Sequence, residues 1–184
     1  MKFLEKHKLG LIITGIVLAV CLFFVSFLAG SYNNIISLEE QVNESYSNIE
    51  VQEKRRADLI PNFVDSVQDY KEFEKETLQQ ITEARSQAQS GNVDMAEKTI
   101  SMVVEKYPDL KASELYKNLQ IELSTTENLI KDYREDYNKQ VKSYIKKTRS
   151  FPTNIILGIM GYETEDFQYT EFNASENAPT NLFE

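Results

Sequence analysis

Few residues in this chain have the chemistry of a catalytic or metal site. Nucleophilic catalysis of the triad kind needs a base such as histidine beside a serine or cysteine. The only histidine, His7, precedes a long apolar segment, and the only cysteine, Cys21, lies inside it, which excludes an intramolecular disulfide and a thiolate metal site. One histidine cannot supply the Glu-x-x-His motifs of a di-iron bundle. We therefore expect no catalytic residue, no metal ligand and no cofactor.

Carboxylates and serines are the remaining candidates for catalysis. Acidic pairs at helical spacing, such as Glu72 with Glu76, are frequent, and a solvated charged face explains them better than acid–base chemistry does. The sequence has neither a P-loop nor a dinucleotide-binding glycine pattern. Composition leaves a Ser–Lys dyad, and so an uncharacterised hydrolase, open, but no local motif indicates one. We predict that the protein is not an enzyme.

The first of two basic clusters is Lys54-Arg55-Arg56, shortly before Pro61. We expect Asp58 to cap a new helix with Pro61 in its first turn, which puts a bend or short break here. One interpretation is structural: the cations complement the dipole of the preceding helix and pair with Asp58. The other is a partner-docking corner. Its candidate residues are Lys54, Arg55, Arg56, Asp58, Pro61 and Asn62.

The second basic cluster lies near the end of the longest predicted helix and leads directly into the apolar stretch FPTNIILGIMGY. Cations followed by an apolar segment match the headgroups and acyl chains of a bilayer surface, so we hypothesise a peripheral membrane contact. The alternative is that the cations complement the helix dipole and the apolar segment plugs the end of a bundle. The candidate contact residues are Lys142, Lys146, Lys147, Arg149, Phe151, Ile155 and Ile156.

An N-terminal apolar segment positions everything that follows it. No residue from Leu9 to Gly30 is charged, and a helix of that length crosses roughly 30 Å of hydrocarbon. A cleaved secretory signal is the alternative, but its apolar region is normally about 7 to 15 residues and ends in a small-x-small site. Ser31 stands where a lipoprotein signal needs cysteine. We predict an uncleaved transmembrane helix over residues 9–30.

Flanking charges predict the orientation of this helix. Lys2, Lys6 and Lys8 precede it, whereas no Lys or Arg follows until Lys54. Basic residues favour the cytoplasmic side. Residues 1–8 should therefore form a cytoplasmic tail, and the remainder of the chain should face outward, to the cell exterior or the periplasm.

The charge balance limits the partners of the outward part. The net charge is -9 at pH 7, and the first eight residues contribute +2, which leaves -11 for the rest. Such a balance repels phosphate backbones, so we expect no nucleic-acid partner. The expected partners are the lipid bilayer through residues 9–30 and a membrane or envelope protein, or a second copy of the chain.

Beyond residue 30, apolar residues recur at steps of three and four, which predicts amphipathic helices. Ser90-Gly91-Asn92 is typical of a turn, Pro108 must end a helix, and the last helix should run from about Ser113 to Arg149. Helices with one apolar stripe each must pack together. We predict an all-α fold in which the transmembrane helix precedes an antiparallel four-helix bundle over residues 31–150. The predicted core comprises Ile35, Leu38, Val42, Tyr46, Ile49, Ile60, Phe63, Val64, Val67, Tyr70, Leu78, Ile81, Ala84, Ala88, Val93, Ala96, Ile100, Val103, Tyr107, Leu115, Leu119, Leu123, Leu129, Ile130, Tyr133, Tyr137, Val141 and Tyr144.

Two shorter segments follow the predicted bundle. Residues 151–162 are apolar with a proline and two glycines, which is typical of a short helix plugging a bundle end. Residues 163–184 are acidic and polar, and we expect an extended or loosely ordered tail. Its isolated aromatic residues are candidates to dock on the bundle.

Two motifs are specific enough to suggest a family. They are the block IEVQEKRRADLIPNF at residues 49–63, the more specific of the two, and Glu105 with Tyr107-Pro108-Asp109-Leu110-Lys111-Ala112 further on. Both resemble motifs of the LemA family of bacterial membrane proteins. The resemblance covers nearly the whole chain in order, including the N-terminal apolar segment. The departures are Glu53 for leucine, Phe73 for histidine, Ile145 for asparagine and Tyr162 for phenylalanine.

The resemblance implies a membrane-anchored antiparallel helical bundle but brings no reaction with it. We therefore expect a non-catalytic envelope scaffold or interaction module. The alternative is a ligand-sensing bundle outside the cytoplasm, in which Tyr133 and Tyr137 line a pocket. Since no second span follows, such a sensor would have to signal through a partner.

Overall fold

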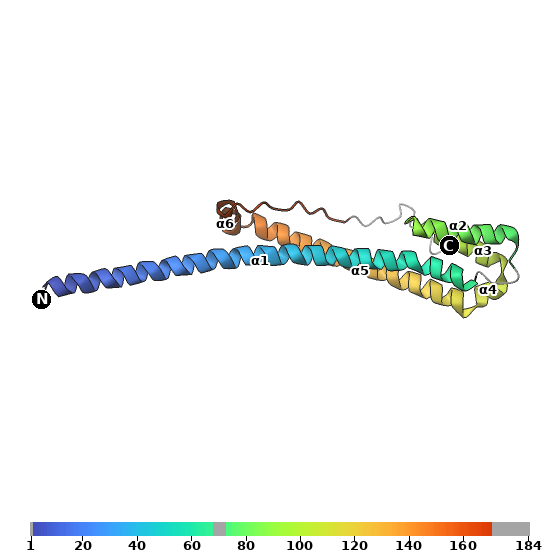
Figure 1. Ribbon diagram of the computed structural model, residues 1–184, viewed down its shortest axis with the longest axis horizontal. Helices are drawn as coiled ribbons and strands as arrows, with labels where there is room; N and C mark the ends of the chain where they lie inside the picture. The colour runs from blue at the N-terminus through green and yellow to red at the C-terminus, as the bar shows by residue number, and fades with distance from the viewer. Residues whose placement is uncertain (1, 68–72, 171–184) are drawn as a thin grey trace, which may run out of the picture. The chain divides into compact units, whose positions relative to one another are not determined.

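The computed structural model describes residues 2–67 and 73–170, with side chains from residue 10 onward. Every regular element in these residues is a helix, so the all-α prediction is confirmed for the described part of the chain. Figure 1 labels the helices. They are α1 (Lys2–Val67), α2 (Lys75–Gln89), α3 (Val93–Lys106), α4 (Pro108–Ala112), α5 (Glu114–Arg149) and α6 (Thr153–Met160).

The chain divides into two compact units, and the helices α1 and α5 each contribute to both. Among the described residues, the first unit comprises those up to Glu44 and Asn138–Tyr169, and the second comprises residues 45–67, 73–137 and 170. The first unit therefore contains the apolar N-terminal segment and α6, whereas the second contains α2, α3 and α4. Each unit is described separately below.

The helix α1 does not bend or break where the sequence predicted. It continues through Pro61 to Val67, so Asp58 lies inside a helix and caps nothing. The missing proline N–H and the ring clash cost roughly 3 kcal/mol in a helix interior. Burial of Phe63, Val64 and Val67 beyond it, at roughly 1.5–3 kcal/mol each, outweighs that cost. The predicted bend or break near Pro61 is therefore wrong.

The turn between α2 and α3 agrees with the sequence prediction. Gly91 has a φ of +86°, a left-handed conformation that glycine adopts readily. The Asn92 N–H donates to the Gln87 carbonyl at 2.9 Å, and the Gly91 N–H donates to the Ala88 carbonyl at 3.0 Å, which is the Schellman pattern. The two helices lie side by side after this turn (Figure 1).

The boundary before α5 is set by Pro108 and Ser113, as predicted. Pro108 begins the five-residue helix α4, which was not predicted. The Ser113 hydroxyl donates to the Leu110 carbonyl at 2.6 Å and accepts the N–H of Tyr116 at 3.3 Å. It thus closes α4 and caps the N-terminus of α5.

One core cluster occupies the second unit and draws buried side chains from α1, α2, α3, α4 and α5. Three predicted core residues are wrong: Tyr46, Leu78 and Leu115 are 39–49% exposed. Threonines occupy interior positions instead; the Thr126 hydroxyl, for example, bonds the carbonyl oxygens of its own helix and needs no partner elsewhere. The cluster comprises Ile60, Phe63, Val64, Val67, Ile81, Ala84, Ala88, Val93, Ala96, Ile100, Val103, Val104, Leu110, Leu119 and Leu123.

In the first unit, the part of α1 that follows the apolar segment buries Ile35 and Val42, and the end of α5 buries Val141 and Tyr144.

The short helix predicted within residues 151–162 is present as α6. It ends at Gly161, whose φ is +67°. The tail is extended from Glu163 to Thr170, while Tyr70, Glu72 and residues 171–184 lie outside the described residues.

Candidate functional site

The six predicted docking residues all lie on α1 within the second unit. Lys54, Arg55, Asp58 and Asn62 are exposed, and Arg56 and Pro61 are half-buried. Because α1 continues to Val67, the three cations do not sit at the C-terminal end of a helix. The predicted complement to a helix dipole is therefore wrong, and the residues form a stretch of helix surface rather than a corner.

The two arginines of this cluster join α1 to different helices. Arg56 Nη2 lies 2.8 Å from Asp94 Oδ1 and 3.6 Å from Glu97 Oε2, both on α3. Arg55 Nη2 lies 2.8 Å from Glu122 Oε2 on α5. The arginines thus pair across helices and not with Asp58, the partner that the sequence suggested.

Two further ion pairs bind α1 to its neighbours in the second unit. Arg134 of α5 lies 2.8 Å from Glu53, and Arg85 of α2 holds both carboxylate oxygens of Asp65, at 2.6 and 3.3 Å. Sequence analysis did not single out Asp65 or Arg134. The only local signal was the position of such charges at the edges of apolar stripes, which cannot specify a partner on another helix.

A polar cleft of about 810 Å³ opens beside Arg56 in the second unit. Three acidic and three basic residues line it, and both arginines of the cleft already have carboxylate partners. Tyr133 and Tyr137 do not line it; Tyr137 is buried and packs on Tyr46, with the ring centroids 5.8 Å apart. The cleft is lined by Glu53, Arg56, Ala57, Gly91, Asn92, Val93, Asp94, Glu127, Asn128, Ile130, Lys131 and Arg134.

The predicted membrane-contact residues belong to the first unit, at the end of α5 and in α6. Lys142, Lys146, Lys147 and Arg149 are all exposed. None of these four cations forms an ion pair with another residue that the structure describes. Their charge is therefore directed to solvent or to a partner, in contrast to the arginines of the second unit.

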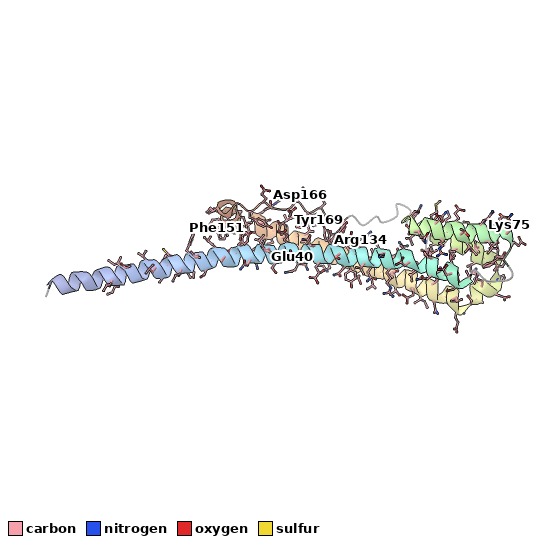
Figure 2. All side chains as sticks on the ribbon, in the orientation of Figure 1. Glu40, Lys75, Arg134, Phe151, Asp166 and Tyr169 are labelled. Atoms are coloured by element: carbon pink, nitrogen blue, oxygen red, sulfur yellow. The ribbon has the colours of Figure 1, made fainter. Side chains whose placement is uncertain are left out.

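The apolar residues of this predicted contact divide between the surface and the interior of the first unit. Phe151 is 79% exposed and Ile155 is 52% exposed, but Ile156 is only 5% exposed, so its assignment to the surface is wrong. Ile156 instead lies on the buried face with Thr153 and Leu157. The surface also includes Ile159, at 72% exposure, and Met160, at 43%, which the sequence analysis did not select. Figure 2 shows Phe151 beside α6.

A group of tyrosines ties the segment after α6 to α1 and α5 within the first unit. The Tyr162 hydroxyl donates to the Glu39 carboxylate and lies 3.2 Å from the Tyr144 hydroxyl. The ring of Tyr162 meets that of Tyr32 edge-on, with the centroids 5.8 Å apart. Burial, followed by the hydrogen bond to Glu39, raises the pKa of the Tyr162 phenol above its usual value.

The start of the tail docks on the same tyrosine group. The Glu165 N–H donates to the Tyr144 hydroxyl at 2.9 Å, and the ring of Phe167 packs edge-on against that of Tyr144 at 5.1 Å. The prediction that aromatic tail residues dock on the helices is thus confirmed for Phe167. Asp166 and Tyr169 mark this segment in Figure 2.

Comparison with known proteins identifies the family. The profile of the LemA family matches residues 45–183, well over half of the chain. The chain belongs to the LemA family. The family assignment made from the sequence motifs is therefore confirmed.

Individual relatives of this LemA family chain agree with the assignment. It is 30% identical to Protein LemA of Metamycoplasma hominis over 168 residues, which cover 84% of this chain and 76% of that protein. It is 22% identical to the magnetosome proteins MamQ 1 and MamQ 2 of Paramagnetospirillum magneticum, over 78% of this chain and 66% of each of theirs. LemA is not known as an enzyme family, and membership defines no reaction.

Proposed function

We propose that this LemA family protein is a non-catalytic scaffold or interaction module of the cell envelope, anchored in the membrane by residues 9–30. One observation carries the proposal. The large apolar side chains of α1 from Leu11 to Phe27 are 45–74% exposed, in a segment whose mean hydropathy reaches 2.9. This helix is therefore long and apolar enough to cross a bilayer, and the residues that the structure describes cover none of its most apolar stretch.

A bilayer is the environment that suits this segment. In water, consecutive Leu, Ile, Val and Phe side chains would be solvated on all sides of the helix. The free-energy cost of that exposure is roughly 25 cal/mol for each Å² of apolar surface. In hydrocarbon this cost disappears, and a helix already satisfies its own backbone groups. The same helix then supplies Ile35, Val42 and Ile49 to the protein interior. The anchor and the rest of the protein thus share one continuous element.

The orientation that we propose places the N-terminus in the cytoplasm and the helices beyond residue 30 outside it, at the exterior or periplasmic face. Lys2, Lys6 and Lys8 before the span support this orientation. Acidic residues dominate the segment after the span until Lys54, and they do not oppose translocation.

The architecture that we propose for α1, α2, α3 and α5 is an antiparallel four-helix bundle. The shared core of the second unit supports it. So do the pairs between α1 and α5, since Ser45 bonds Asp136, Glu53 bonds Arg134 and Arg55 bonds Glu122. Positions that ascend in α1 meet positions that descend in α5, as antiparallel neighbours require.

The surface that we propose for an envelope-protein partner is the face of α1 that carries Lys54, Asp58 and Asn62, none of which lines the polar cleft. All three residues are exposed, and a surface of one cation, one acid and one amide suits a polar partner rather than lipid. A photocrosslinker at Asp58 should capture a protein in intact cells, whereas one at Gln79 on α2 should not. Equal yields at both positions would argue against this surface.

Membrane fractionation tests the proposal as a whole. The full chain should stay with membranes after washing at high salt and at alkaline pH, whereas a variant lacking residues 1–30 should be released. A protease added outside spheroplasts should then digest the full chain down to its anchor. Release of the full chain by the wash, or protection of its helices from the protease, would contradict the proposal.

A further inference from the structure

The helix α6 leaves a large apolar face uncovered at its outer side. Ile155 and Ile159 are four residues apart on α6 and therefore lie on one face, at exposures of 52% and 72%. Phe151, in the turn just before the helix, is 79% exposed. No residue between Arg149 and Glu163 is charged. A short surface helix in water normally carries polar side chains on its outer face, so this face is suited to contact with something other than water.

Contacts within the first unit hold α6 near the end of the apolar segment of α1. Tyr162 follows α6 directly, packs on Tyr32 and bonds Glu39. Tyr32 is two residues beyond Gly30, where the apolar segment ends, which is about 3 Å along a helix. Figure 1 shows α6 at the level where α1 continues alone toward its N-terminus. If residues 9–30 span the bilayer, α6 lies at its surface.

The cations next to α6 favour lipid as the occupant of this face. Lys146, Lys147 and Arg149 are exposed on the last turn of α5, immediately before Phe151. None of them is paired with an acid among the described residues. A cationic edge beside an apolar face is complementary to anionic headgroups above acyl chains. Tyr32 and Tyr162 also match the preference of tyrosine for the interface.

We infer that α6 is an interfacial helix that inserts Phe151, Ile155 and Ile159 into the outer leaflet beside the transmembrane segment, while the end of α5 contacts anionic headgroups. This inference rests on the proposed membrane anchor. It gives the protein two contacts with one bilayer, and the link through Tyr162 fixes the first unit against the membrane surface. A single span alone would leave this unit free to tilt.

Tryptophan fluorescence in vesicles tests the inference, because the chain has no tryptophan of its own. Three full-length variants are needed: Ile159→Trp on α6, Phe24→Trp in the apolar segment, and Ile121→Trp on α5 in the second unit. Ile121 is the matched control, since it is an isoleucine at 61% exposure, against 72% for Ile159. Each variant is reconstituted into phosphatidylcholine–phosphatidylglycerol vesicles that contain lipids brominated either near the headgroup or at mid-chain.

The expected result is blue-shifted emission from Ile159→Trp that loses at least about half of its intensity to bromines near the headgroup. Phe24→Trp should be quenched by mid-chain bromines, and Ile121→Trp by neither lipid. If Ile159→Trp behaves like Ile121→Trp while Phe24→Trp is quenched, the inference is wrong but the anchor stands. Blue-shifted emission at Ile159→Trp without bromine quenching would mean that protein covers this face, which also overturns the inference. Loss of quenching at Phe24→Trp would overturn the anchor itself.

Discussion

The two units of this protein differ in whether their cations are paired with acids and whether their apolar side chains are buried. In the second unit, Arg55, Arg56, Arg85 and Arg134 each meet a carboxylate of another helix, and the apolar side chains converge on one core. In the first unit the exposed cations at the end of α5 form no ion pair with an acid among the described residues, and α6 exposes Ile155 and Ile159. The first pattern suits a surface in water, and the second suits a surface against lipid.

The contrast shows that local composition does not reveal what a basic cluster does. Lys54-Arg55-Arg56 and Lys146-Lys147 look alike in the sequence. The arginines of the first cluster lie within reach of acids on α3 and α5, while the second cluster borders an uncharged helix. What distinguishes them is the neighbouring elements, which bring acids to one cluster and apolar side chains to the other.

The largest expected effect concerns the core of the second unit. Ile100 is 1% exposed, so Ile100→Ala should lower the free energy of unfolding by about 2–5 kcal/mol. Ile121→Ala, at an exposed position, should change it by less than about 0.5 kcal/mol. Urea unfolding followed by circular dichroism in detergent compares the two. Equal effects would mean that the second unit is not held by its core.

A smaller effect is expected at the tyrosine group of the first unit. Tyr144 is 1% exposed and accepts the Glu165 N–H, so Tyr144→Phe should cost roughly 1–3 kcal/mol by leaving that donor unsatisfied. Amide exchange should accelerate in residues 163–169 and stay unchanged in α2 and α3. Tyr169→Phe, at a 51% exposed residue, is the control. Unchanged exchange in the tail would show that Tyr144 does not hold it.

The ion pairs of the second unit should contribute more to the free energy of unfolding the more deeply they are buried. The Arg56 side chain is 19% exposed and that of Arg55 is 50% exposed. Arg56→Ala should therefore cost roughly 1–2 kcal/mol, and Arg55→Ala at most about 1 kcal/mol. A double-mutant cycle of Arg56→Ala with Asp94→Ala isolates the pair energy. A coupling energy indistinguishable from zero would show that the pair of Arg56 and Asp94 does not stabilise the contact between α1 and α3.

The unpaired cations of the first unit should have the smallest single effect, and it should depend on lipid. Lys147→Ala should weaken the contact of α6 with anionic vesicles by about 1 kcal/mol, seen as a red shift of the Ile159→Trp emission. The shift should vanish in neutral lipid and at high salt. Lys117→Ala, in the second unit, should have no effect. A shift independent of lipid charge would contradict the role given to these cations.

Much of the fold could be predicted from the sequence, because its signals are local. Gly91 and Ser113 set their boundaries through hydrogen bonds within a few residues. Pro61 was misread because the burial that carries α1 past it comes from other helices. Ile156 was misassigned because α6 is apolar on both faces, so periodicity cannot say which face is buried. The acid partners of Arg56 and Arg134 lie 38 and 81 residues away along the chain, which no spacing rule specifies.

The intact mass of the protein purified from washed membranes tests the central claim most directly. The claim is that residues 9–30 remain part of the protein and hold it in the bilayer. The account predicts that the membrane fraction contains a chain whose mass includes residues 9–30. A mature chain that begins near Ser31 and is recovered in the soluble fraction would contradict it.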